Sequence, residues 1–163
     1  MISSAIKADK IKEKDAVEVI DWLMRLNDKA AALVCGAKAA TDITGFSLLG
    51  HAWEMADASH TGIRFYLGSI PLYGDVSRLA DEWCFPGGAF NNADYFKAHI
   101  KFDPQVRQET QMDLFDPQTS GGLLFAVKRE KAEFCEREAL GRGVPLWKIG
   151  EVTDSGVIEV ALN

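Results

Sequence analysis

Long apolar segments are missing from this sequence. The longest apolar runs, "AAALVCGA" and "GGLLFAV", are far shorter than the roughly 20 residues that a transmembrane helix needs. Met1 is not followed by the charged and apolar regions of a signal peptide. The sequence therefore predicts a cytoplasmic protein with no membrane partner.

Positive charge is also scarce. The chain has 18 basic against 24 acidic side chains and a net charge of −6, and its lysines and arginines form no local cluster. A surface of this kind repels nucleic acid. We therefore expect no nucleic-acid partner.

Cysteine is sparse, and the familiar nucleotide-binding fingerprints are absent. Cys35, Cys84 and Cys135 are widely spaced with no CxxC pair, which argues against a disulfide framework or a zinc site. We interpret them as small core residues or idle thiols. The chain contains neither GxxxxGK(S/T) nor GxGxxG, so a P-loop or Rossmann site is excluded as the basis of nucleotide binding.

Helical and β-type patterns alternate along the chain, which is long enough for one domain with a proper core. The patterns predict one or two helices over 13–35 and single helices over 46–58, 74–84 (with Asp75 near its start) and 129–140. Strands are predicted over 37–41, 62–67 and 122–128, with a loop at "FPGGAFNN" (85–92) and a terminal hairpin over 146–162. The predicted class is α+β, a mixed β-sheet covered by helices, and the sheet should include 122–128 and the hairpin.

Large apolar side chains on these elements should form the core. Residues 1–12 show no clear element of their own and look like a connector that arrives from elsewhere. The residues expected in the core are Trp22, Phe46, Leu49, Trp53, Met55 or Ala56, Leu123, Leu124 and Phe125 or Val127.

The stretch "TDITGF" (41–46) leads directly into a predicted helix. A helix N-terminus presents free N–H groups and a partial positive charge, and a glycine lets the backbone approach an oxyanion. Asp42 is placed to bind the Mg²⁺ that accompanies nucleotide phosphates, since this ion takes one or two carboxylates. The alternative is that Asp42 or Thr44 simply caps the helix.

A second stretch, "DPQTSGG" (116–122), precedes a predicted buried strand. Asp116 and Pro117 favour a turn, Thr119 and Ser120 offer hydroxyls, and the two glycines permit a positive φ. It could form a second anion-binding loop or an ordinary turn.

Several motifs together resemble one family. They are "AATDITGFSLLGHAWEMA", "IPLY", "PGGAFNN", "LFDPQTSGGLLFAV" and "KIGEVT". In this order and spacing the chain resembles the C-terminal domain of selenophosphate synthetase (selenide, water dikinase), within the aminoimidazole ribonucleotide synthetase superfamily. The resemblance covers nearly all of residues 2–160. It implies that 1–163 is a single domain, with 1–12 as a connector from an N-terminal domain that this sequence lacks.

The resemblance implies a function that this domain shares with that N-terminal domain. The family makes selenophosphate, AMP and phosphate from ATP, selenide and water, and its ATP lies between the two domains of a dimer with Mg²⁺ held by aspartates. By this resemblance Asp42 is a metal ligand, and Thr44, Gly45 and Ser47 form a phosphate-facing edge. Thr119 and Ser120 join the cofactor-binding set. His51 either orients the loop or is an ordinary structural residue.

Other family features have no counterpart in this sequence. The glycine-rich segment, the catalytic cysteine or selenocysteine, the nearby lysine and the remaining metal-binding aspartates belong to the N-terminal domain. No residue here is therefore assigned as catalytic, and the isolated chain should be inactive and a monomer or weak dimer, although the full-length enzyme is a homodimer. Ser47 stands where the family usually has glycine.

Two alternatives stay open. The chain could act as a stand-alone, non-catalytic interaction module, or as part of a related ATP-dependent kinase or synthetase of the superfamily. DNA upstream of the Met1 codon would separate them, because only a selenophosphate synthetase should carry the cysteine or UGA codon there.

Overall fold

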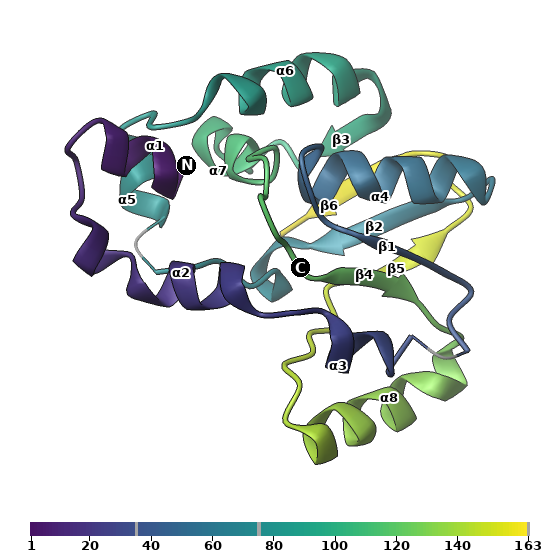
Figure 1. The fold of residues 1–163 in the computed structure, drawn as a ribbon. Coiled ribbons are helices and arrows are strands. Elements are labelled where there is room, and N and C mark those ends of the chain that lie inside the picture. The colour runs from purple at the N-terminus through teal and green to yellow at the C-terminus, as the bar shows by residue number, and fades with distance from the viewer. Residues whose placement is uncertain (35, 75, 163) are drawn as a thin grey trace.

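The computed structural model describes residues 1–34, 36–74 and 76–162, and within them helices surround two β-sheets (Figure 1). The first half of this part contains α1 (Ile2–Lys7), η1 (Glu13–Asp15), α2 (Val17–Met24), α3 (Asp28–Ala31), β1 (Ala39–Asp42), α4 (Ser47–Ala58), β2 (Gly62–Tyr66), η2 (Leu67–Ser69) and α5 (Val76–Asp81). The second half contains α6 (Gly87–Phe96), η3 (Lys97–His99), β3 (Ile100–Phe102), α7 (Gln108–Asp113), β4 (Leu123–Ala126), α8 (Arg129–Arg142), β5 (Gly150–Thr153) and β6 (Ile158–Ala161).

The larger sheet has four strands in the order β3-β6-β2-β5. β2 pairs in parallel with β6 and antiparallel with β5, and β6 also pairs in parallel with β3. Alternate side chains along β2 and β6 point to one face, which is the period-2 pattern of a half-buried strand. Those at Phe65, Ile158 and Val160 are almost completely buried.

Helix α4 covers this sheet and completes the main core. Leu49, Ala52 and Ala56 share one side of the helix, as the 3.6-residue period requires, and none is more than 1% exposed. Gly50 lies on a neighbouring side, where an added Cβ would approach Phe96 Cε2 to 2.6 Å. The absence of a side chain at residue 50 therefore lets α4 and α6 pack closely.

The smaller sheet consists of β1 and β4. They pair antiparallel, with Ala39 opposite Ala126 and Asp42 opposite Leu123. This pairing brings the end of β1, where "TDITGF" lies, next to the start of β4, where "DPQTSGG" ends.

The predicted α+β class is confirmed, and most predicted elements are present with shifted boundaries. β1, α4, β2, β4 and α8 all fall within or close to their predicted ranges. α8 ends where Gly143 adopts a left-handed backbone with φ of 64°, the usual role of glycine after a helix.

The predicted arrangement of the sheet is wrong in two respects. β5 and β6 do not form a hairpin, because β2 lies between them and pairs with both. The strand predicted over 122–128 is also not part of that sheet, since β4 pairs with β1 instead.

Three predicted segments differ as well. "FPGGAFNN", predicted to be a loop, forms most of α6 after Pro86, whose fixed φ suits a helix start. Residues 13–35, predicted as one or two helices, contain the short η1, α2 and α3. Residues 1–12, expected to lack an element, contain α1, whose Ala5 is fully buried. Asp75 lies outside the described residues.

The predicted core is only partly correct. Leu49 is fully buried, and of the two alternatives at 55 and 56 it is Ala56 that is buried, whereas Phe46 is 47% exposed. The other predicted core side chains are only partly buried, and these are Trp22, Trp53, Leu123, Leu124, Phe125 and Val127. The main core is formed by other side chains, mainly on α4, α5, α6 and the larger sheet, and its largest fully buried ones are Phe65 and Phe96.

Cys84 and Cys135 are buried free thiols, which confirms their interpretation as core residues, and Cys35 is outside the described part. No helix in the described ranges is both long and apolar enough to pass through a bilayer.

Candidate functional site

The junction between β1 and α4 carries most of the predicted site residues. Asp42 is the last residue of β1 and is exposed, so its predicted surface position is confirmed, although it ends a strand instead of lying in a loop. Two hollows found in the structure, one between α6 and α7 and one beside α8, are lined by other residues. The predicted concave surroundings of Asp42 therefore stay a prediction.

The two motifs lie side by side and exchange main-chain hydrogen bonds. The amide of Gly121 donates to the carbonyl of Ile43 at 3.0 Å, and the amide of Ile43 donates to the carbonyl of Gly122 at 3.0 Å. The amide of Gln118 also donates to the carbonyl of Thr44 at 3.0 Å. The "DPQTSGG" loop therefore fixes the backbone of the "TDITG" turn.

Glycine at position 121 is required by this close approach. An added Cβ would lie 2.4 Å from the carbonyl oxygen of Ile43, closer than two non-bonded atoms can approach. Asn27 further stabilises this loop, because its side-chain amide donates a hydrogen bond to the carbonyl of Gly121 at 3.0 Å.

His51 on α4 holds the same turn from the other side. Its Nε2 lies 2.9 Å from the Thr44 hydroxyl and accepts from the amide of Phe46 at 3.4 Å, while its Nδ1 lies 3.0 Å from Glu54 Oε2. This set fits the tautomer with the proton on Nδ1, so the Thr44 hydroxyl donates to Nε2. The contacts agree with the expectation that His51 orients the loop. They also mean that the hydroxyl proton of Thr44 is already used.

Ser47 does not lie at the surface edge that the sequence predicted for it. Its side chain is fully buried, and its hydroxyl has no hydrogen-bond partner. Its φ is 66°, a left-handed conformation that glycine adopts without strain. The backbone at this position is therefore one that favours glycine, as the resemblance had implied for residue 47.

Thr119 and Ser120 are exposed in the second motif, immediately before Gly121. Gly45, in the turn itself, is also exposed. Asp42, Gly45, Thr119 and Ser120 thus belong to two segments that the main-chain bonds bring together, and Thr44 is partly buried between them.

Sequence reasoning missed Asn92, which supports the turn from α6. Its side-chain amide donates to the carbonyl of Gly45 at 2.9 Å and to the carbonyl of Phe115 at 3.1 Å, and the residue is only 7% exposed. The sequence signal that could have revealed this role was the helical spacing of Ala89, Asn92 and Phe96, which are all buried in the structure. The two glycines at 87 and 88 and the asparagine pair at 91 and 92 favoured the prediction of a loop instead, because both residue types are typical of loops.

Two carboxyl groups lie at the start of the second motif, because Asp113 precedes it by three residues and Asp116 is its first residue. Burial and the nearby charge of Asp116 raise the pKa of Asp113 to about 7. Burial also raises the pKa of Asp116, although the amino group of Met1, 2.6 Å from its Oδ1, opposes that shift. Both residues are partly buried at or just after the end of α7, whereas Asp42 is exposed.

A complete metal-binding set does not occur in the described ranges. No three His, Cys, Asp or Glu side chains gather there closely enough to hold a metal ion. Asp42 is thus a single exposed carboxylate beside a turn of main-chain groups.

Comparison with known proteins identifies the family. The sequence profile of the family described as "AIR synthase related protein, C-terminal domain" matches residues 2–163. The chain belongs to this family. Among solved structures, the crystal structure of tt0281 from Thermus thermophilus is similar with a TM-score of 0.51 and 18% identity, covering 81% of this chain and 34% of that one. At this identity the likeness shows the AIR synthase-related fold alone.

Within this family, the similar proteins include enzymes named selenide, water dikinase. The one from Carboxydothermus hydrogenoformans is 40% identical over 155 residues, which is 94% of this chain and 45% of the relative. The one from Pelobacter propionicus is 41% identical over 167 aligned residues, covering 100% of this chain and 48% of the relative. The resemblance predicted from the motifs is confirmed. The chain spans a little under half the length of these relatives.

Proposed function

We propose that this chain is the C-terminal part of a selenide, water dikinase, which forms selenophosphate, AMP and phosphate from ATP, selenide and water. The observation that carries the proposal is the similarity of 40% and 41% along nearly the whole chain to enzymes of that name. Its two specific motifs also lie together, joined by main-chain hydrogen bonds.

In this proposal the "TDITG" turn forms part of a Mg-ATP site. Asp42 is exposed and lacks further metal-ligating side chains around it in the described residues. One carboxylate still fits Mg²⁺, because the ion is usually bound through one or two carboxylates together with phosphates and water. Bound Mg²⁺ would neutralise charge on the ATP phosphates, and the other protein ligands would come from the rest of the enzyme.

The chain's own residues have positioning roles in this proposal. His51 and Asn92 hold the turn in place, and the "DPQTSGG" backbone fixes it from the side. Gly45, Thr119 and Ser120 offer exposed main-chain and hydroxyl groups to an anion. The Thr44 hydroxyl already donates its proton to His51 Nε2 in a hydrogen bond, so its remaining lone pairs suit a metal ion and not an anion. Phosphoryl transfer depends largely on such positioning.

The test is a chimera in which this chain replaces the matched part of the Carboxydothermus hydrogenoformans relative. The chimera should release AMP from ATP and selenide. Asp42→Asn should lower that rate by about 100-fold or more, as loss of one transition-state charge contact does, with an unchanged melting temperature. Asp57→Asn is the matched control, because Asp57 is an exposed carboxylate on α4, and it should keep full activity.

Three results would contradict the proposal. The first is a well-folded chimera that releases no AMP. The second is an Asp42→Asn protein that unfolds without a specific loss of activity, which would make Asp42 a structural residue. The third is rapid AMP release by the 163-residue chain alone.

A further inference from the structure

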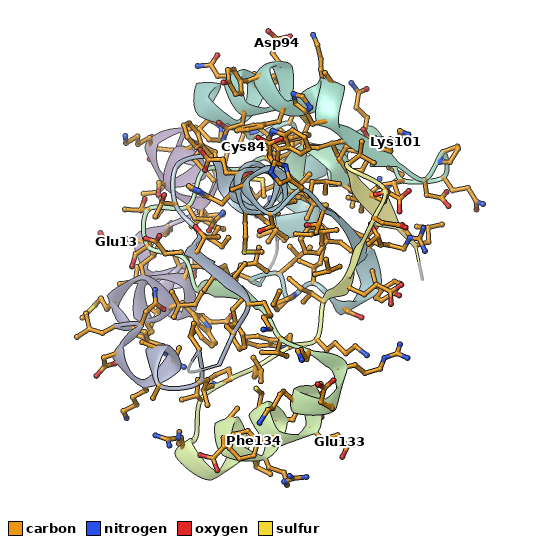
Figure 2. The ribbon with its side chains drawn as sticks, turned by 90° about the vertical axis from the view of Figure 1, so that its right-hand side faces the viewer. Glu13, Cys84, Asp94, Lys101, Glu133 and Phe134 are labelled. Atoms are coloured by element: carbon orange, nitrogen blue, oxygen red, sulfur yellow. The ribbon has the colours of Figure 1, made fainter. Side chains whose placement is uncertain are left out.

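Helix α6 borders an open groove that the proposed Mg-ATP site does not use. Phe90, Ala93, Asp94 and Lys97 line one side of it, α7 lines the other, and Ile100 and Phe102 of β3 lie beneath. The groove has a volume of about 470 Å³. Asp94 marks the outer side of α6 in Figure 2, and Lys101 marks β3.

The groove has an apolar floor and a polar rim. Ile100, Met112 and Phe115 are buried side chains of the floor. On the rim, Asp94 forms an ion pair with Lys97, and Gln108 and Gln111 line the α7 side. Such an apolar centre inside a polar rim is typical of protein–protein contact surfaces.

An exposed aromatic pair continues the groove beyond the start of α6. Trp83 is 42% exposed and Phe90 is 46% exposed, and their rings stack at 6.5 Å between centroids. The ring of Phe85, itself buried, supports both from below with edge-on contacts. Tryptophan and phenylalanine are enriched in the cores of protein interfaces, and tryptophan is enriched in binding hot spots.

The backbone of Trp83 adds a second unusual feature. Its φ is 52°, a conformation that is a genuine outlier for a bulky residue. Such strain persists where the surrounding structure holds it, and it is concentrated at functional segments. Trp83 therefore combines a strained backbone with a large apolar ring that is partly exposed.

The proposed occupant follows from the length of the relatives. This chain matches only 45% and 48% of two of them, and its family is a C-terminal domain, so their other half precedes the matched region. That half would join the chain at Met1, whose nitrogen lies beside Asp116, three residues after the end of α7. Helix α1 contacts α5, and Lys10 pairs with Glu82 at 2.9 Å. Glu82 is the residue before Trp83, so the aromatic pair lies close to the junction.

We propose that the α6–α7 groove and the Trp83–Phe90 pair form the docking surface for the amino-terminal half of the enzyme, with an apolar side chain of that half in the groove. This inference rests on the proposed function. Docking would also reach the candidate site, because Asn92 of the same helix binds the carbonyl of Gly45. Helix α6 therefore connects the proposed docking surface to the turn that carries Asp42.

The test uses the amino-terminal half of the Carboxydothermus hydrogenoformans relative as the probe, mixed with this chain. Hydrogen–deuterium exchange in the complex should show protection over 83–98 and 108–115. The relative's own C-terminal half serves as the positive control for binding, and AMP release by the mixture reports on the proposed function separately.

Matched variants locate the surface. Phe90→Lys should weaken binding about tenfold or more, as loss of a central aromatic contact does. Gln108→Arg, a rim change that does not touch the aromatic pair, should also weaken it. Leu140→Lys is the control, because Leu140 on α8 is 83% exposed, and it should bind normally. Thermal melts establish that each variant is folded.

The outcomes separate the two proposals. Protection over α6 and α7 without AMP release would support the docking surface and count against the proposed activity. AMP release with protection elsewhere, for example over α2 or α8, would overturn the docking surface and leave the activity supported. Failure to bind a probe that binds its own partner would overturn it too. Protection of the same segments in this chain alone, increasing with its concentration, would also overturn the docking proposal, because the occupant of the groove would then be a second copy of the chain.

Discussion

At the scale of single residues, Ser47 combines two unfavourable features in one position. Its hydroxyl is buried without a partner, and its backbone is left-handed. Each costs stability, about 1–3 kcal/mol for an unpaired buried polar group and about 1–2 kcal/mol for a left-handed non-glycine residue. Ser47 directly follows the turn that carries Asp42, so the loss of stability that it causes is located next to the candidate site.

Ser47→Gly should raise the free energy of unfolding by about 1–4 kcal/mol, because it removes both costs. The greater freedom of glycine in the unfolded chain offsets about 0.5–1 kcal/mol of that gain. Ser47→Ala is the matched variant, since it removes the hydroxyl but keeps the Cβ and its strain. It should give a smaller gain. Urea unfolding measures both. Lower stability in both variants would mean that the hydroxyl makes a stabilising contact.

Sequence reasoning succeeded at residues whose roles are local. The junction of a strand, a Thr-Gly pair and an apolar helix pointed to an exposed Asp42, and His51 lies within one helical turn or two of the atoms it holds. It failed at Ser47, because φ and burial there depend on how α4 packs. A serine between Phe46 and Leu48 gives no sign in the sequence that its hydroxyl is buried without a partner.

At the scale of elements, α6 is the segment that sequence reasoning misjudged most. Gly87, Gly88 and the asparagine pair weaken helix propensity, and the prediction of a loop followed from them. Tertiary packing outweighs that preference, because Ala89, Asn92 and Phe96 are all buried against neighbours. The same packing gives Asn92 its two main-chain partners, which no local pattern contains.

Asn92→Ala should lower the free energy of unfolding by about 2–4 kcal/mol, because the carbonyls of Gly45 and Phe115 would both lose a buried donor. The neighbouring Asn91→Ala is the control, since Asn91 is exposed, and it should change stability by about 0.5 kcal/mol or less. Chemical denaturation of the two variants gives the comparison. Equal effects would show that Asn92 does not support the turn.

At the scale of the whole molecule, the topology joins segments that are far apart in the chain. β2 pairs with both β5 and β6, which begin 88 and 96 residues after it by their first residues, Gly62, Gly150 and Ile158. The sequence of 146–162 has the local marks of a hairpin, two β-rich runs around a turn. This pattern predicts the turn correctly but does not identify the strand that each run pairs with. A third strand can lie between two antiparallel strands without changing the residue pattern of either one.

Gly150 offers a direct test of that topology. An added Cβ would lie 2.2 Å from the carbonyl oxygen of Arg64 on β2, so Gly150→Ala should force β5 away from β2. Overpacking of this kind costs about 1–3 kcal/mol, and exchange of the Tyr66 amide, which donates to Ile149 at 2.9 Å, should become faster. Gly122→Ala is the control, because an added Cβ there meets no atom within 4 Å. If β5 paired with β6 instead, Gly150→Ala would leave the Tyr66 amide unaffected.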